Sequence, residues 1–366
     1  MSDADFPDRH DPTPPTARAI LLDELPMHLI TLALVVASAA VLAAHDVAIT
    51  LADVTGNLMV YLCCGLFMVL PRAITLLRAH RPRHPAAFLA QHVASVVSTS
   101  AVVATLPTCA ILVLLMPFFS ALKAMVPVFH PYTWDATLIA ADRALFFGHD
   151  PWRVIQPVLG YPVVTASLAA LYHGWALVLY GGTLWLVFAR AARGVRRRYI
   201  LAFVLIWTVI GFALAAGMAS VGPCFVGPIL GNHHFDAQMA YLHAADRDLP
   251  VMTLTVQEML LERFRHASHN LGSGITAMPS MHIAFACLFW LTVRQVSPRA
   301  GRWFFAFLVA IWIGSVHLAY HYALDGVVAV LATVAIWKLS GVIFVAWDRW
   351  RLGSTIRASA GAAFPA

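Results

Sequence analysis

Charged side chains are scarce in this sequence: Asp, Glu, Lys and Arg make up 11% of its 366 residues, whereas hydrophobic residues make up 60%. An ordinary soluble domain carries about 25% charged residues. The shortage excludes a soluble globular protein. Runs of about 20 apolar residues, long enough to cross roughly 30 Å of hydrocarbon, recur along the whole chain instead.

Cysteine is also rare, and its spacing matches no metal site or disulfide framework: the five thiols are Cys63, Cys64, Cys109, Cys224 and Cys287. A thiol inside an apolar span is usually a small packing residue. An internal repeat is lacking as well, which leaves a transporter built from two related halves without support.

The apolar runs predict an all-α, polytopic integral membrane protein of about eight transmembrane helices, six of which form a core. The predicted spans are 25–45, 56–77, 98–122, 163–189, 199–220, 281–298, 303–320 and 324–346. We expect a disordered cytoplasmic tail at 1–24, two accessory transmembrane helices at 25–97, the six-helix membrane core at 98–347 and a second cytoplasmic tail at 348–366.

The basic residues are distributed unevenly between the two sides of this topology. With the N-terminus inside, 18 of the 24 Lys and Arg residues lie on inner loops or helix ends, the densest group being "RAARGVRRRY" at 190–199. The positive-inside rule then places both termini in the cytoplasm, and in a bacterial inner membrane the outer loops face the periplasm. The net charge of +6 therefore reports topology, and no nucleic-acid partner is expected.

Two long segments, 123–162 and 221–280, fall on the outer side, and both contain apolar residues at helical spacing. Connections of this length are usually functional.

Two polar clusters lie at the outer ends of predicted spans. In "AMPSMH", Pro279 suits the first turn of a helix, so Ser280 and His282 lie where free N–H groups and the helix dipole favour an anion. In "HYALD", His321 and Asp325 are four residues apart, on one helical face, where the carboxylate can orient the imidazole. Taken singly, Ser280 is typical of a helix cap, His282 of an interfacial residue, and the His–Asp pair of a structural hydrogen bond. Their occurrence together near membrane depth favours a functional interpretation.

These two clusters resemble the second and third motifs of the type 2 phosphatidic acid phosphatase superfamily. The form Pro-Ser-x-His with His-x3-Asp is similar to the branch that contains inositol phosphorylceramide synthases. The stretches "GMASVGPCFVGP" and "DRALFFGHDPW" also resemble bacterial members of that branch. The resemblance covers roughly residues 120–330, and it implies that the six-helix core at 98–347 is phosphatase-like and catalytic.

The resemblance implies a chemical role for each matching residue. His321 would attack phosphorus and form a phosphohistidine, with Asp325 orienting it. His282 would protonate the leaving oxygen and then activate the acceptor. Ser280 would hold phosphoryl oxygens. No metal or cofactor is implied. The expected reaction is an inositolphosphotransferase step of sphingolipid metabolism at the outer leaflet, from a phospholipid to ceramide or another lipid alcohol.

The sequence departs from the family pattern at its phosphate-binding cations. Ser315 occupies the position of the third-motif Arg, and the first motif is matched only in part between Lys123 and Pro131. A phosphoryl transition state still needs positive charge. The expected substitutes are Arg263, Arg265 and Lys123, with a contribution from His317 on the helical face of His321.

Three other interpretations stay open at this point. A lipid phosphate phosphatase, acting on phosphatidic acid or prenyl phosphates, would differ only in using water as the acceptor. A transporter or metal-handling protein draws on the outer histidines His233, His234, His243, His266 and His269, although their spacing matches no compact metal site. A non-catalytic scaffold would tolerate replacement of both motif histidines.

Overall fold

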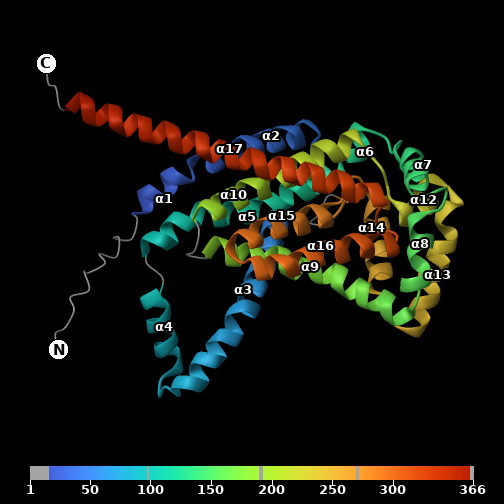
Figure 1. Ribbon diagram of the computed structural model, residues 1–366, viewed down its shortest axis with the longest axis horizontal. Helices are drawn as coiled ribbons and strands as arrows, with labels where there is room; N and C mark the ends of the chain where they lie inside the picture. The colour runs from blue at the N-terminus through green and yellow to red at the C-terminus, as the bar shows by residue number, and fades with distance from the viewer. Residues whose placement is uncertain (1–15, 97–98, 189–192, 269–271, 363–366) are drawn as a thin grey trace, which may run out of the picture.

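The computed structural model describes residues 16–96, 99–188, 193–268 and 272–362, and within these ranges every regular element is a helix (Figure 1). Seven helical segments in this part of the chain are long and apolar enough to cross a membrane. The prediction of an all-α polytopic membrane protein is thereby confirmed. The segments lie in α2 (Leu25–Ala44), α3 (Leu51–His80), α5 (Thr99–Ala124), α9 (Pro162–Phe188), the run Gly194–Gly217, α16 (Pro298–His317) and α17 (Ala323–Ala362).

The predicted span 281–298 is the exception. It forms α15 (Met281–Val296), whose 16 residues extend only about 24 Å at 1.5 Å per residue. Eleven of the 16 residues are buried, and the helix packs along α16 and α17. A helix that is apolar on all sides belongs in a protein interior. α15 is therefore the central helix of the core.

The N-terminal segment is more ordered than the expected tail at 1–24. Ala17–Asp23 form helix α1, which packs against α2 and α5. Glu24 pairs with Arg196 of α10 (Arg193–Leu205), and Asp23 pairs with Arg351 of α17. These ion pairs join residues far apart in the sequence, so the sequence alone does not reveal them. For this reason the tail prediction is wrong from residue 17 onward. Residues 1–15 lie outside the described part.

The C-terminal tail expected at 348–366 is also replaced by structure, since α17 continues to Ala362. At 40 residues, α17 is about 60 Å long. Asp348, on its second half, pairs with Arg197. Asp325 lies in its first turn. The helix therefore connects a group of ion pairs at one end of the molecule with the candidate site at the other (Figure 1).

The accessory region expected at 25–97 contains α2 and α3, and in addition a shorter helix, α4 (Pro85–Val96). α3 packs against α5 and α9. Pro117 of α5 has no N–H for the Val113 carbonyl, and Asn57 of α3 donates to that carbonyl at 2.8 Å. A polar contact that satisfies a freed carbonyl in this way fixes α3 to the core.

The outer segments fold into short helices that gather at one end of the bundle, opposite α1 (Figure 1). They are α6 (Val126–Phe129), α7 (Asp135–Leu145), α8 (Pro151–Leu159), α12 (Pro223–Leu230), η2 (His233–Phe235), α13 (Asp236–Asp248) and α14 (Met252–Arg265). The run before α12 comprises α10 (Arg193–Leu205), the π-helical η1 (Ile206–Leu214) and α11 (Ala215–Gly217). The helical patterns expected in both segments are thus present.

Candidate active site

His321 lies in the short connection between α16 and α17. α16 ends at His317, and Ala319 then adopts a left-handed conformation with φ of 61°. This reverses the chain so that the N–H groups of Tyr320 and His321 both donate to the Ser315 carbonyl, at 3.0 and 3.2 Å. The backbone of His321 is therefore fixed by the end of α16.

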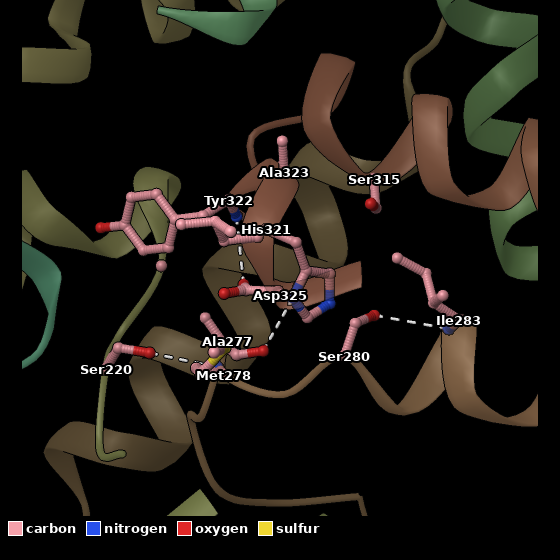
Figure 2. Close-up of polar contacts among 12 residues, drawn as sticks. Ser220, Ala277, Met278, Ser280, Ile283, Ser315, His321, Tyr322, Ala323 and Asp325 are labelled. Carbon is pink, nitrogen blue, oxygen red and sulfur yellow. Dashed lines mark hydrogen bonds and ion pairs between the residues drawn. The ribbon is translucent and has the colours of Figure 1, made fainter. Parts of the chain in front are cut away.

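The His321 ring donates through one nitrogen to two acceptors. Nδ1 lies 2.9 Å from the Ala277 carbonyl oxygen and 3.1 Å from Asp325 Oδ2 (Figure 2). Because neither partner can donate, Nδ1 carries the proton and Nε2 keeps its lone pair. Tyr322 N also donates to Asp325 Oδ2, at 3.1 Å, and Asp325 is fully buried. The arrangement leaves Nε2 available as a nucleophile.

Ser280 is the N-cap of α15 and is fully buried; its Oγ accepts from Ile283 N at 3.4 Å (Figure 2). Pro279 consequently lies just before the helix rather than in its first turn. Ser280 N donates to the Asp325 carbonyl at 3.4 Å. The beginning of α15 is thus joined directly to the beginning of α17, and the two sequence motifs meet.

His282, the second residue of α15, has its ring centroid 6.4 Å from that of His321. It lies between two rings of α9, Tyr172 and Trp175, each with a centroid distance of 4.2 Å. Lys123 at the end of α5 is within electrostatic range of His282. The structure therefore brings together both motif histidines and one predicted cation.

Two buried carboxylates of α7, which the sequence analysis did not single out, hold the connection around His321. Asp135 accepts from Val221 N and Gly222 N at 3.0 Å each and from the Tyr322 hydroxyl at 2.8 Å. Asp142 accepts from the N–H groups at the start of α17, at 2.7 and 3.0 Å. Their spacing of seven residues puts both on one helical face. Two carboxylates seven residues apart in an apolar stretch were the sequence signal that could have identified Asp135 and Asp142 as buried partners.

Asp142 is poised between its ionised and neutral forms. Burial raises the pKa of its carboxyl to about 6, against the hydrogen bonds from Ala323 and Leu324, which lower it. The nearby charges of Asp325 and Asp150 also raise this pKa, and the value of about 6 is the net result of all these effects. At neutral pH the ionised carboxylate lies at the N-terminus of α17, where the helix dipole favours an anion.

The segment 219–222 connects the two motif loops. Ser220 accepts through its carbonyl from Ala277 N at 2.9 Å and through its Oγ from Met278 N at 3.1 Å. Gly222 has φ of 89°, and a Cβ there would lie 2.6 Å from the Tyr320 carbonyl oxygen. Only glycine allows this approach. The stretch "GMASVGPCFVGP" thus positions both histidine-bearing loops.

This arrangement of a capped Ser-x-His helix and an oriented His–Asp pair can be compared with known families. A model described as the PAP2 superfamily matches residues 136–339, more than half of the chain. The chain belongs to the PAP2 superfamily. A search of curated proteins and one of solved structures each returned no match. Membership supports an enzyme of the phosphatase type that acts on lipid phosphates in a membrane.

The PAP2 match includes Ser280, His282, His321 and Asp325. It begins at residue 136 and therefore excludes Lys123. Lys123 reaches the site through packing: a Cβ at Gly274 would lie 3.0 Å from Lys123 Cγ. Lys123, a cation near His282, is therefore supplied from outside the matched region.

The other three predicted phosphate ligands, Arg263, Arg265 and His317, lie in different surroundings. The Arg263 guanidinium lies against Gly272, in the loop before Ser280. Arg265 is exposed on α14. His317 is buried, with Nε2 2.9 Å from Thr165 Oγ1 and its ring edge-on to Tyr241. His317 therefore joins α16 to α9 and α13 through the contacts of its ring.

Two of the five histidines predicted on the outer side make local contacts with carboxylates. His233 Nδ1 lies 2.8 Å from Asp236, and His234 Nε2 lies 2.7 Å from Asp150. Within the described ranges no three His, Cys, Asp or Glu side chains form a group that could hold a metal ion. His269 lies outside those ranges.

Proposed function

We propose that this PAP2 protein is a lipid phosphotransferase that moves a phosphoinositol-like headgroup through a phosphohistidine on His321. The observation that carries the proposal is the pair of acceptors on His321 Nδ1, the Ala277 carbonyl and Asp325, which leave Nε2 with its lone pair. The second histidine, with its centroid 6.4 Å away, supports a role in proton transfer.

In the first step of the proposed reaction, the Nε2 lone pair forms a bond to phosphorus. The bond between phosphorus and the diacylglycerol oxygen breaks, and His282 gives its proton to that oxygen. The imidazolium of His321 keeps its Nδ1 proton, which is hydrogen-bonded to Asp325. The Asp325 carboxylate stabilises the positive charge. Lys123, Ser280 and N–H groups at the start of α15 suit the phosphoryl oxygens.

In the second step, neutral His282 takes the proton of an acceptor hydroxyl. The acceptor oxygen bonds to phosphorus and the N–P bond breaks, which restores His321. Transfer to ceramide or another lipid alcohol and hydrolysis by water differ only in this acceptor. Neither step uses a metal, so we expect the rate to be insensitive to chelators.

The scarcity of cations favours a phosphodiester substrate. Ser315, in place of an Arg, directs its Oγ to the Trp312 carbonyl at 2.7 Å rather than supplying charge. A diester carries one negative charge, whereas a phosphomonoester such as phosphatidic acid carries up to two. A site with Lys123 close to His282 is therefore better suited to the diester.

We predict that kcat/KM for phosphatidylinositol exceeds that for phosphatidic acid at least about tenfold, the effect of one charge-assisted contact. The measurement is turnover of purified protein on both labelled lipids, with and without ceramide. Headgroup transfer that depends on ceramide supports the transferase. Faster phosphate release from phosphatidic acid would instead identify a phosphatase, with Arg263 supplying the missing charge.

We also propose that the site faces the periplasm of a bacterial inner membrane, with both termini in the cytoplasm. In a cysteine-free background, Phe147→Cys between α7 and α8 should react with a membrane-impermeant maleimide in intact cells, because Phe147 is 95% exposed at the site end. His84→Cys, between α3 and α4, should react only after permeabilisation. Labelling of both from outside would contradict the topology.

A further inference from the structure

The ring of His282 is enclosed by two aromatic faces of α9. Tyr172 stacks on it with an interplanar angle of 16°, and Trp175 packs against it at 36°, both with centroid distances of 4.2 Å. Tyr320 extends the stack beyond Tyr172, at 4.9 Å and 14°. Tyr172 and Trp175 are 2% and 8% exposed, so both rings are withdrawn from solvent.

Burial disfavours a positive charge on the His282 ring, and so do the basic groups that lie near it. Lys123 approaches from α5, His173 from α9, and His321 from the connection between α16 and α17. No carboxylate accepts a hydrogen bond from His282 among the described residues. The contrast with His321 is clear, since His321 is paired with buried Asp325.

A cation between aromatic faces is attracted by the negative potential of each ring, and the attraction is strongest where water is excluded. Tryptophan provides the strongest such face. We propose that Tyr172 and Trp175 are positioning residues that stabilise protonated His282, taking the place of a carboxylate. This rests on the proposed function only in assigning His282 as the proton donor to the leaving oxygen.

The two rings are suited to this role by their faces rather than by their polar atoms. Tyr172 Oη and Trp175 Nε1 are both buried and have no hydrogen-bond partner. Replacing Tyr172 with phenylalanine therefore removes no bond and keeps the ring face. This supplies a matched pair of variants, Tyr172→Phe and Tyr172→Leu, that separates the π face from the hydroxyl.

The experiment measures the pH at which His282 is half protonated, by NMR of protein with ¹⁵N-labelled histidine. The His282 signal is identified by its loss in His282→Gln. Tyr172→Leu and Trp175→Leu should each lower this midpoint by about one pH unit, which is the size of one desolvated cation–π contact. Tyr172→Phe should keep the wild-type midpoint. In turnover assays, the basic limb of the pH profile should move in the same direction.

The sign of the shift decides the proposal. If the rings only exclude water, their removal hydrates His282 and raises the midpoint. A raised or unchanged midpoint in the leucine variants therefore overturns the proposal. Trp207→Leu is the control. Trp207 is also buried, and its ring contacts Phe119, Phe203 and Phe285 but not His282. The midpoint of His282 in this variant should therefore stay that of the wild type.

Two further measurements keep the outcome unambiguous. If the leucine variants do not fold, fluorinated tryptophan placed at position 175 weakens the ring face without changing its shape, and the midpoint should fall stepwise with each fluorine. A midpoint that does not change with fluorine overturns the proposal. Turnover retained by His282→Gln would refute the proposed acid role, while the titration would still report whether the rings stabilise the cation.

Discussion

His321→Gln should lower turnover by at least about ten-thousand-fold, because removal of a nucleophile leaves only the rate that binding and charge stabilisation provide. The amide of glutamine can still donate to the Ala277 carbonyl or to Asp325, the two acceptors of His321 Nδ1. We therefore expect the melting temperature to fall by only a few degrees. Turnover of labelled lipid and thermal unfolding in detergent are the two measurements.

Asp325→Asn should be less damaging, with a loss of about a hundred- to ten-thousand-fold, since Asp325 orients the nucleophile and does not react. The asparagine keeps an acceptor oxygen, but its amide can force His321 into the wrong tautomer. His233→Gln provides a control, because His233 and Asp236 form another His–Asp pair at 2.8 Å, exposed on the surface. Its turnover should equal that of the wild type.

A labelled intermediate gives a direct test of the proposed covalent step. When the wild type reacts with labelled phosphatidylinositol and is quenched rapidly without acid, label should remain bound to the protein. Acid should then release this label, as expected for a phosphoramidate. His321→Gln should trap none. Turnover of His321→Gln within tenfold of the wild type, or label that persists in that variant, would contradict nucleophilic attack by His321.

The membrane helices could be predicted from the sequence because apolar runs of sufficient length have few alternatives. The run at 281–298 also forms a helix, α15, but a run of this composition can be lipid-facing or buried in protein, and the sequence does not show that α15 is buried by α16 and α17. Contacts between distant segments, such as Asp23 with Arg351, explain the ordered ends that the tail predictions omitted.

The site was only partly predictable. The His321–Asp325 contact was predicted from a spacing of four residues on one helical face. The contact is present, but His321 lies in the connection before α17 and only Asp325 is on the helix. The enclosure of His282 by Tyr172 and Trp175 depends on how α9 lies beside α15, and no local pattern shows that. Asp135 belongs to an intermediate case, since a carboxylate in an apolar helix demands a partner, but the sequence does not say which.

Asp135→Ala should destabilise the protein by several kcal/mol, because it leaves three buried donors without an acceptor. These are Val221 N, Gly222 N and the Tyr322 hydroxyl, and each unsatisfied buried donor costs about 1–3 kcal/mol. A folded domain is stable by only about 5–15 kcal/mol. We therefore expect a large fall in melting temperature and a loss of turnover, because Tyr322 is the neighbour of His321.

A double-mutant cycle tests whether this effect passes through Tyr322. Tyr322→Phe removes one hydrogen bond and leaves Asp135 with its two backbone donors, so it should cost about 1 kcal/mol. Adding Tyr322→Phe to Asp135→Ala should cost less than it does alone, since the hydroxyl has already lost its acceptor. Asp236→Ala, which removes an exposed carboxylate, is the control and should leave the melting temperature unchanged. If Asp135→Ala melted no lower than Tyr322→Phe, the Asp135 contacts with Val221 and Gly222 would contribute nothing to the fold around His321.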